Sequence, residues 1–532
     1  MSSVRPMLVS GALVRVFLTG VGFAAAPVQP CVLHEQQKLI PSDAGESFNV
    51  GASVSIDGDT AVVGAWRAIE GNVSSGAAYV LRRDGGCTPA VAGGECWYEE
   101  QKLISVDAVS GDLFGWSAAI GGERIVVGAR FRTVDVRSGA AFVFRRDKND
   151  TVLDPSDDFW VQESVLSASD AAPSDDFGNS VSISGDWAVV GAPKDDDACP
   201  ELADCDSGSA YVFRRDDNGT AFDPGDDYWV EEGKLTTPTT VFGDNFGYSV
   251  AISGDWAIVG AWQSDINGME SGAAYAFRRV DNDTPADPTD DFWIWDDVLL
   301  PEDGAAFDEF GFDVGIDGDR AVVGSWLDDD DGNQSGSAYV FRLDDNDTPF
   351  DPTDDLWLEE DKLRADDATA GDEFGKSVSL DGETIVVGSF EDDDACEAEG
   401  DPDPHCDSGS AYVFRYTDNG TPLDPGDDHW TQTAKLIASD GATRHFFGRV
   451  DVSGQTVIAG SLDDEAGPSA GAAYLYTIAL ECADLLDIAD FQTCILGDGG
   501  GVLIGCEVFD LDADLDVDLD DYRLLAPALT GP

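Results

Sequence analysis

Basic residues are scarce in this sequence, whereas acidic residues are abundant. The 532 residues include 30 Lys and Arg against 105 Asp and Glu, which gives a formal net charge of −75 at pH 7. A field of this sign repels nucleic acids and anionic lipids, so we expect no nucleic-acid partner. The same field attracts divalent cations and keeps a surface solvated. A solvated acidic shell and a calcium-related role therefore both stay open.

Histidines and the common catalytic motifs are also lacking. The four histidines lie in different contexts at positions 34, 405, 429 and 445, and the chain has no HExxH, GxSxG, Walker or GxGxxG motif. Carboxylate pairs occur throughout, but in so acidic a chain no one pair indicates a glycosidase site. The sequence therefore predicts a protein that is not an enzyme.

Long apolar runs are missing outside the N-terminus. Arg5 precedes a mostly apolar stretch over 7–23, and small residues follow over 22–26. This pattern predicts a secretory signal peptide over 1–26, and hence a secreted or cell-surface protein. A membrane anchor is the alternative, but Arg15 and the short length disfavour it. No other segment is long and apolar enough to span a bilayer, so we expect no membrane span in the mature chain.

Ten cysteines are present, and six of them flank short loops. These six form the local pairs Cys87 and Cys96, Cys199 and Cys205, and Cys396 and Cys406. Local pairs of this kind suit disulfides in an exported protein. Zinc is the rival interpretation, but the spacings are not CxxC pairs and most have no histidine beside them. We favour disulfides.

A repeat dominates the rest of the chain. Its clearest copy runs from Asp176 to Pro193, where Val181 and Ile183 alternate with serines and an apolar run follows a Ser-Gly-Asp turn. This is the pattern of two short strands. Seven copies start near glycines 63 to 73 residues apart, namely Gly51, Gly115, Gly178, Gly247, Gly311, Gly375 and Gly448. A fixed period of this length indicates a repeat architecture.

Each repeat contains four strand-like pieces. In the third copy these lie over 177–183, 187–192, 208–214 and 229–235. A four-stranded antiparallel unit cannot bury both faces alone, whereas seven units arranged radially can. We therefore predict an all-β fold, a seven-bladed β-propeller of four-stranded antiparallel blades over 31–478.

The count of fourth strands predicts how the ring closes. No fourth strand follows the seventh third strand, but the missing piece stands at the other end as Leu33–Leu39. The N-terminal segment should thus be the outer strand of the last blade. This would bring Cys31 close to Cys482, so we predict a Cys31–Cys482 disulfide, which leaves Cys494 and Cys506 to pair. The alternative pairs Cys482 with Cys494 and leaves Cys31 bonded to Cys506 or free.

The repeated motifs resemble a known family. Phe-Gly, Val-Val-Gly-Ala-Pro and Gly-Ser-Ala-Tyr-Val-Phe, as they stand over 177–213, are similar to the FG-GAP repeat, the blade of the integrin α-subunit propeller and of many bacterial exported proteins. The resemblance covers roughly 33–478 and implies a propeller fold. Many members carry a DxDxDG calcium loop between the first two strands, whereas this chain has only short turns there, such as Ser184–Asp186. The first copy has Val50 for Phe, and the seventh is one residue short.

A second repeated element lies between the third and fourth strands. Asn-x-Thr is followed there by Asp-Pro-x-Asp-Asp, which brings carboxylate and amide oxygens together in a turn. Oxygens of this kind suit Ca²⁺, but the same residues also make solvated Asx turns. The triplets are N-glycosylation sequons as well. The candidate calcium ligands are Asn218, Asp223, Asp226, Asn282, Asp287, Asp290, Asn346, Asp351 and Asp354.

Acidic loops between the second and third strands carry aromatic neighbours. The resemblance implies that these loops lie on the ligand-binding face of the integrin propeller. Exposed aromatic residues beside acids would suit a sugar or a protein ligand, although blade packing and solvation are the more common reason for such residues. The candidate ligand-binding residues are Trp66, Trp262, Trp326, Asp328 and Phe390.

The composition changes after Ile478. Acids stand at alternate positions of a loop that opens a short apolar stretch, Tyr522–Leu525, and Leu515 occupies the place of the usual glycine. This segment looks like a dockerin-type or EF-hand calcium loop. It implies a small helical calcium-binding module over 479–532 with a possible cohesin-like partner; an acidic tail is the alternative. The candidate ligands are Asp510, Asp512, Asp514, Asp516, Asp518 and Asp521.

Together these features predict an exported binding, adhesion or scaffold protein. The propeller would contact an extracellular protein or glycan, and the calcium-stabilised tail would attach to a partner. One alternative is a propeller enzyme that acts on extracellular polysaccharide. Another is a structural component of a surface layer or filament.

Overall fold

The structure is a computed structural model, and it describes the repeat region. The described residues are 35–45, 47–83, 97–134, 136–149, 158–197, 205–220, 225–281, 288–344, 346, 355–393, 407–417, 429–441, 444–462 and 470–478. The predicted signal peptide over 1–26 and the predicted module over 479–532 lie outside them. No helix among the described residues is long and apolar enough to cross a membrane.

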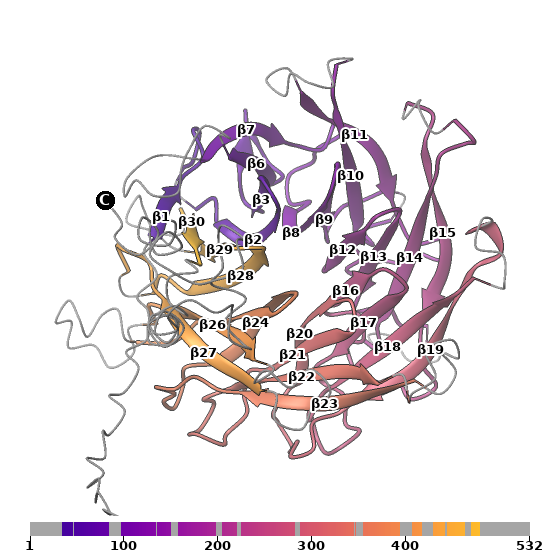
Figure 1. The fold of residues 1–532 in the computed structure, drawn as a ribbon. Coiled ribbons are helices and arrows are strands. Elements are labelled where there is room, and N and C mark those ends of the chain that lie inside the picture. Colours follow the sequence, from indigo (N-terminus) through magenta and orange to yellow (C-terminus); the bar gives the residue numbers. More distant parts are fainter. Residues whose placement is uncertain are drawn as a thin grey trace, which may run out of the picture. The chain divides into compact units, whose positions relative to one another are not determined.

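Seven four-stranded antiparallel sheets form the blades of a ring (Figure 1). The strands of the first three blades are β2 (Val50–Asp57), β3 (Thr60–Ala65), β6 (Ala77–Arg83) and β7 (Trp97–Leu103); β8 (Phe114–Gly121), β9 (Arg124–Ala129), β10 (Ala140–Asp147) and β11 (Phe159–Leu166); and β12 (Val181–Ser184), β13 (Trp187–Ala192), β14 (Ser209–Asp216) and β15 (Tyr228–Leu235).

The next three blades repeat this order. Their strands are β16 (Val250–Ser253), β17 (Trp256–Ala261), β18 (Ala273–Val280) and β19 (Phe292–Leu299); β20 (Phe310–Asp317), β21 (Arg320–Ser325), β22 (Ser337–Asp344) and β23 (Leu356–Leu363); and β24 (Phe374–Asp381), β25 (Thr384–Ser389), β26 (Ser410–Thr417) and β27 (His429–Leu436). Among the described residues, the other elements outside the seventh blade are a two-stranded hairpin, β4 (Ile69–Glu70) with β5 (Val73–Ser74), and a 3₁₀ turn, Pro288–Asp290.

The seventh blade joins the two ends of the repeat region. It contains β28 (Phe447–Ser453), β29 (Thr456–Ser461), β30 (Ala472–Thr477) and β1 (Glu35–Leu39). β1 pairs antiparallel with β30, and Leu39 lies opposite Ala473. The predicted closure of the ring by the N-terminal strand is therefore confirmed, as is the count of seven blades.

The core lies between neighbouring blades. One hydrophobic cluster, for example, combines Val62 and Val80 of the first blade with Phe114, Ile125 and other residues of the second. The phenylalanine of each Phe-Gly pair is fully buried at such a junction, as Phe114 shows, and packs edge-on against Phe142 at 5.3 Å. Because each blade buries its faces only against its neighbours, the repeat has to close into a ring.

The glycine of the Phe-Gly pair allows the blades to approach closely. Gly115 has φ +84°, and a Cβ added there would lie 2.2 Å from the carbonyl oxygen of Ala77 in the preceding blade. Only glycine combines this left-handed conformation with so short a distance. The Phe-Gly pair is thus the joint between adjacent blades.

Candidate functional site

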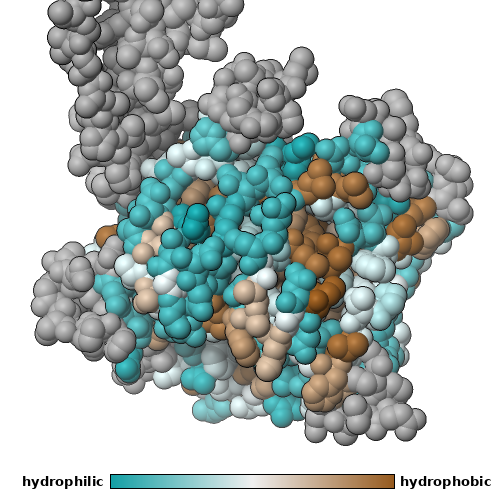
Figure 2. Space-filling model, turned by 90° about the horizontal axis from the view of Figure 1, so that it is seen from below, coloured by the Kyte–Doolittle hydropathy of each residue, from teal (hydrophilic) through white to brown (hydrophobic). Residues whose placement is uncertain are grey.

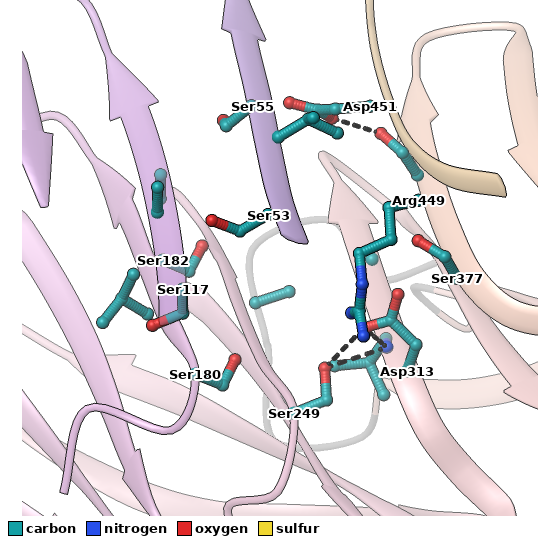
Figure 3. A pocket seen from close by; sticks show the side chains of 18 of the residues that line it. Ser53, Ser55, Ser117, Ser180, Ser182, Ser249, Asp313, Ser377, Arg449 and Asp451 are labelled. Carbon is teal, nitrogen blue, oxygen red and sulfur yellow. Dashed lines mark hydrogen bonds between the residues drawn. The ribbon is translucent and has the colours of Figure 1, made fainter. Parts of the chain in front are cut away.

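Polar side chains of the innermost strands line a cavity of about 420 Å³ on the propeller axis (Figure 3). Many of these side chains accept a backbone N–H from the next blade. Val250 N–H donates to Ser180 Oγ at 3.1 Å, and Val378 N–H donates to Asp313 Oδ2 at 2.9 Å. Ile56 N–H donates to Asp451 Oδ2 at 2.7 Å across the closing junction. The polar lining therefore first serves to join the blades around the axis.

A belt of aromatic and cationic side chains follows the Phe-Gly end of this cavity. Its members are mostly the residue after each Phe-Gly pair and the residue after each second strand. We call this set the aromatic belt, and it consists of Trp66, Trp116, Arg130, Asn179, Tyr248, Trp262, Phe312, Trp326, Lys376, Phe390 and Arg449.

The belt is continuous from the first blade to the seventh. Trp66 and Trp116 have ring centroids 5.4 Å apart, and the Arg130 guanidinium lies 4.1 Å from the Trp116 ring. Arg130 also donates to the Asn179 side chain at 3.0 Å, and Asn179 donates to the Tyr248 carbonyl oxygen.

The second half of the belt is linked by ring contacts. Phe312 lies 5.0 Å from Tyr248 and 5.2 Å from Trp326 between ring centroids. The Lys376 ammonium lies 4.1 Å from the Trp326 ring, and the Arg449 guanidinium lies 5.3 Å from Phe390. Aromatic planes beside cations around one opening form a surface that can stack on a ligand and orient a charged group.

Three carboxylates beside the aromatic belt contact a hydrogen-bond donor or a cation of the belt. Burial raises the pKa of Glu309 to about 7, although Trp326 Nε1–H donates to it at 2.8 Å. Burial also raises the pKa of Glu373, which forms an ion pair with Lys376, and the pKa of Asp176, which lies 3.2 Å from Arg130. These acids position the belt.

The predicted aromatic residues all lie in the belt, but their exposure differs from expectation. Trp66, Trp262 and Trp326 are half-buried, and Phe390 is only 5% exposed. Asp328 is buried as well, because its carboxylate accepts from the Tyr339 hydroxyl at 2.8 Å and lies 3.0 Å from Lys362 Nζ. The expectation of exposed side chains was thus wrong for Phe390 and Asp328.

The contacts of Asp328 recur in other acidic loops. Lys234 lies 2.8 Å from both Asp170 and Asp195, and Lys435 similarly joins Asp367 and Asp392. The oxygens of Asp170, Asp195 and Asp197 are close enough together to hold a metal ion, yet the Lys234 ammonium already contacts all three. These loops therefore hold a cation supplied by the chain itself.

The Asn-x-Thr loops are described only in part. In the third blade the Asn218 amide donates to Asp226 at 3.0 Å, and the Thr220 hydroxyl donates to the same carboxylate at 2.6 Å. Asn346 and Asp290 are exposed. Asp223, Asn282, Asp287, Asp351 and Asp354 lie outside the described residues, so calcium binding by these loops stays a prediction.

The C-terminal calcium ligands and most cysteines also lie outside the described residues. Cys205 is the one described cysteine, and its side chain is buried. Each predicted pairing involves at least one cysteine beyond the described part, so the disulfides stay predictions.

Sequence reasoning missed seven belt residues. Six follow a Phe-Gly pair, namely Trp116, Asn179, Tyr248, Phe312, Lys376 and Arg449, and the seventh is Arg130, which follows a second strand. The repeated position itself was the available signal, because an inner-strand residue next to the axial glycine must face the axis. The seventh copy is one residue short, but the consequence of this deletion depends on the register of the strands.

The sheets, their circular order and the axial cavity define a seven-bladed β-propeller. The FG-GAP repeat model matches seven segments, residues 33–81, 97–144, 160–213, 229–277, 293–341, 357–414 and 430–476. These segments cover more than half of the sequence, so the chain belongs to the FG-GAP repeat family. No curated protein matches the chain significantly.

Proposed function

We propose that this protein is an exported, non-catalytic binding protein that acts in adhesion or as a scaffold. Its propeller contacts an extracellular glycan or protein through the face that carries the aromatic belt. The observation that supports this proposal is the belt itself, a continuous set of half-buried rings beside an axial cavity. Large aromatic side chains at a concave opening are typical of binding hot spots.

Other apolar side chains are exposed on the outer strands. They include Trp295 at 39% and Leu356 at 51% exposure. Figure 2 shows hydrophobic areas that are separated by hydrophilic surface on the side seen there. Neither Trp295 nor Leu356 lines the axial cavity, so we favour the belt as the binding surface.

A screen of the full chain against arrayed glycans and extracellular proteins tests this proposal. Replacing Trp116 and Tyr248 together by alanine should weaken capture of a hit by about tenfold or more. The control is Trp295→Ala, which removes an exposed indole from an outer strand. Equal loss in both variants, or no loss in either, would exclude the belt as the binding surface.

A polysaccharide-cleaving enzyme is a second candidate, and raised pKa values favour it. Burial raises the pKa of both Asp313 and Asp451 in the cavity, and that of Glu309 to about 7 near the belt. Acids of this kind can act as proton donors. Incubation of the chain and its Glu309→Gln variant with extracellular polysaccharides decides this point, because an enzyme would release reducing ends and the variant would not.

The attachment role of the C-terminal segment is part of the proposal. Its alternating acids would bind calcium and stabilise a module that docks to a cohesin-like partner. The sequence pattern over 510–521 supports this role.

A further inference from the structure

The aromatic belt has a gap at the junction between the seventh and first blades. The residue after the first Val-Gly pair is Ala52, whereas other blades carry Trp116, Tyr248 or Phe312 there. In the seventh blade this position is deleted. The strand register shows this deletion. Arg449 lies opposite Gly460 in the seventh blade, and the equivalent glycine of the first blade, Gly64, lies opposite Ser53. The deletion therefore places a guanidinium where the other blades have a serine or an aspartate.

Arg449 forms no ion pair or hydrogen bond with an anionic side chain among the described residues, although the carboxylate of Asp313 lies near enough to attract its guanidinium electrostatically. Its side chain extends into the cavity (Figure 3), and its Nε–H is buried without a hydrogen-bond acceptor. By contrast, Arg130 pairs with Asp176 and Lys376 pairs with Glu373. The nearby carboxylate of Asp313 already accepts from Ser249 and from the backbone of Val314 and Val378.

A second polar group at the gap is also unsatisfied. Asn49 is 8% exposed, lines the cavity and has a buried Oδ1 without a donor among the described residues. Buried polar atoms are satisfied in the great majority of cases, so two unsatisfied atoms that line one cavity point to a missing ligand. One of these atoms is a charged donor and the other is an acceptor.

We infer that the axial cavity binds the carboxylate of an acidic sugar, with Arg449 as the counter-ion of that carboxylate. This inference rests on the proposed function and specifies its ligand. A guanidinium favours a carboxylate, because its N–H groups match the two oxygens. A sugar hydroxyl can donate to Asn49 Oδ1, and the flat rings of Trp116 and Tyr248 suit the apolar face of a sugar. The cavity volume of about 420 Å³ falls within the range of small-ligand sites.

The net charge of the chain gives this site an unusual salt dependence. A formal charge of −75 repels an acidic sugar at long range, whereas the Arg449 contact is short and enclosed. Raising the salt from about 10 mM to about 150 mM shortens the Debye length from about 30 Å to about 8 Å. The affinity for an acidic sugar should therefore increase over this interval, while that for a neutral sugar should not change.

Titration calorimetry of the full chain tests the inference. The probes are the trimer of galacturonic acid and the neutral trimer of galactose. We expect the acidic trimer to bind at least about tenfold more tightly than the neutral one, and Arg449→Gln to remove this preference. The control Arg364→Gln removes an equal charge from an exposed side chain and should preserve it.

A second variant keeps Arg449 and closes the gap. Ala52→Trp places an indole at the position that Trp116 occupies in the next blade, so it should weaken binding of the acidic trimer by about tenfold. Thermal unfolding of each variant verifies that it is folded.

Three outcomes would overturn the inference. They are equal affinity for the two trimers, a preference for acid that survives Arg449→Gln, and no binding of either trimer. Equal affinity that is lost with the Trp116 and Tyr248 substitutions would still support a glycan-binding belt. If neither trimer binds, the screen against arrayed glycans and proteins still tests the proposed binding function, because it does not depend on an acidic sugar.

Discussion

The ammonium of Lys362 lies 3.0 Å from the buried carboxylate of Asp328. The same ammonium contacts Asp303 at 2.8 Å, and the Tyr339 hydroxyl lies 2.8 Å from a carboxylate oxygen of each aspartate, so it can donate to either one. The cluster joins two loops, which contain Asp303 and Asp328, to strands β22 and β23. An acidic loop of this blade is thus neutralised by a lysine of the same chain.

Removing this lysine should destabilise the propeller. Lys362→Met leaves the charge of Asp328 buried without its cation, which should cost about 2 to 3 kcal/mol of unfolding free energy after allowance for partial solvent exposure. The midpoint of urea unfolding measures the change. In the fourth blade Val298 stands opposite Tyr275, as Lys362 stands opposite Tyr339, so Val298→Met is the matched control. An equal shift in both variants would show that the cluster adds nothing specific.

A single methyl group added at the joint between adjacent blades should lower the unfolding free energy of the propeller. Gly115→Ala forces a Cβ against the Ala77 carbonyl oxygen at φ +84° and should cost about 3 kcal/mol or more. Gly122 also has a positive φ but no neighbour within 4 Å of an added Cβ, so Gly122→Ala should cost only about 1 kcal/mol. Unfolding midpoints of the two variants provide the comparison, and similar losses would contradict the role of the joint.

Buried acids of the Phe-Gly turns should make the protein more stable below neutral pH. Burial raises the pKa of Asp244 to about 6 from an ordinary 3.8. The folded state therefore holds this proton more tightly than the unfolded state. The resulting stabilisation is complete below pH 3.8 and is lost as the pH rises through about 6.

Asp244→Asn keeps an acceptor for the Val241 N–H and removes the titration. Between pH 5 and pH 7.5 the variant should show a flatter stability profile, by about 1 kcal/mol, in urea unfolding. The exposed Asp319 serves as the control, since Asp319→Asn removes the same charge. A parallel profile for wild type and Asp244→Asn would rule out this acid as a source of the pH dependence.

Calcium binding should depend on the C-terminal acids. In calorimetric titration of the full chain, replacement of Asp512 and Asp521 by alanine should abolish the tightest binding event, because two of the predicted oxygen ligands are lost. Asp226→Ala provides the comparison from an Asn-x-Thr loop. Unchanged heat in the double variant and reduced heat in Asp226→Ala would move the calcium site to the propeller.

The sequence by itself determined the architecture of this protein. The seven Phe-Gly copies, the alternation of apolar residues and the missing fourth strand are local patterns, and strand formation and pairing follow local patterns. The same count correctly placed the N-terminal strand beside β30, since one outer strand was needed at each blade.

Only the tertiary structure decided what the side chains do. Asp328 had the pattern of an exposed loop acid, but Lys362, 34 positions later, neutralises it inside the blade. The belt gathers single residues from distant repeats, and the shortened seventh copy gained a meaning only when strand register placed Arg449 on the axis. Ring closure brings together side chains that lie far apart in the sequence, and no local pattern specifies which of them will be paired.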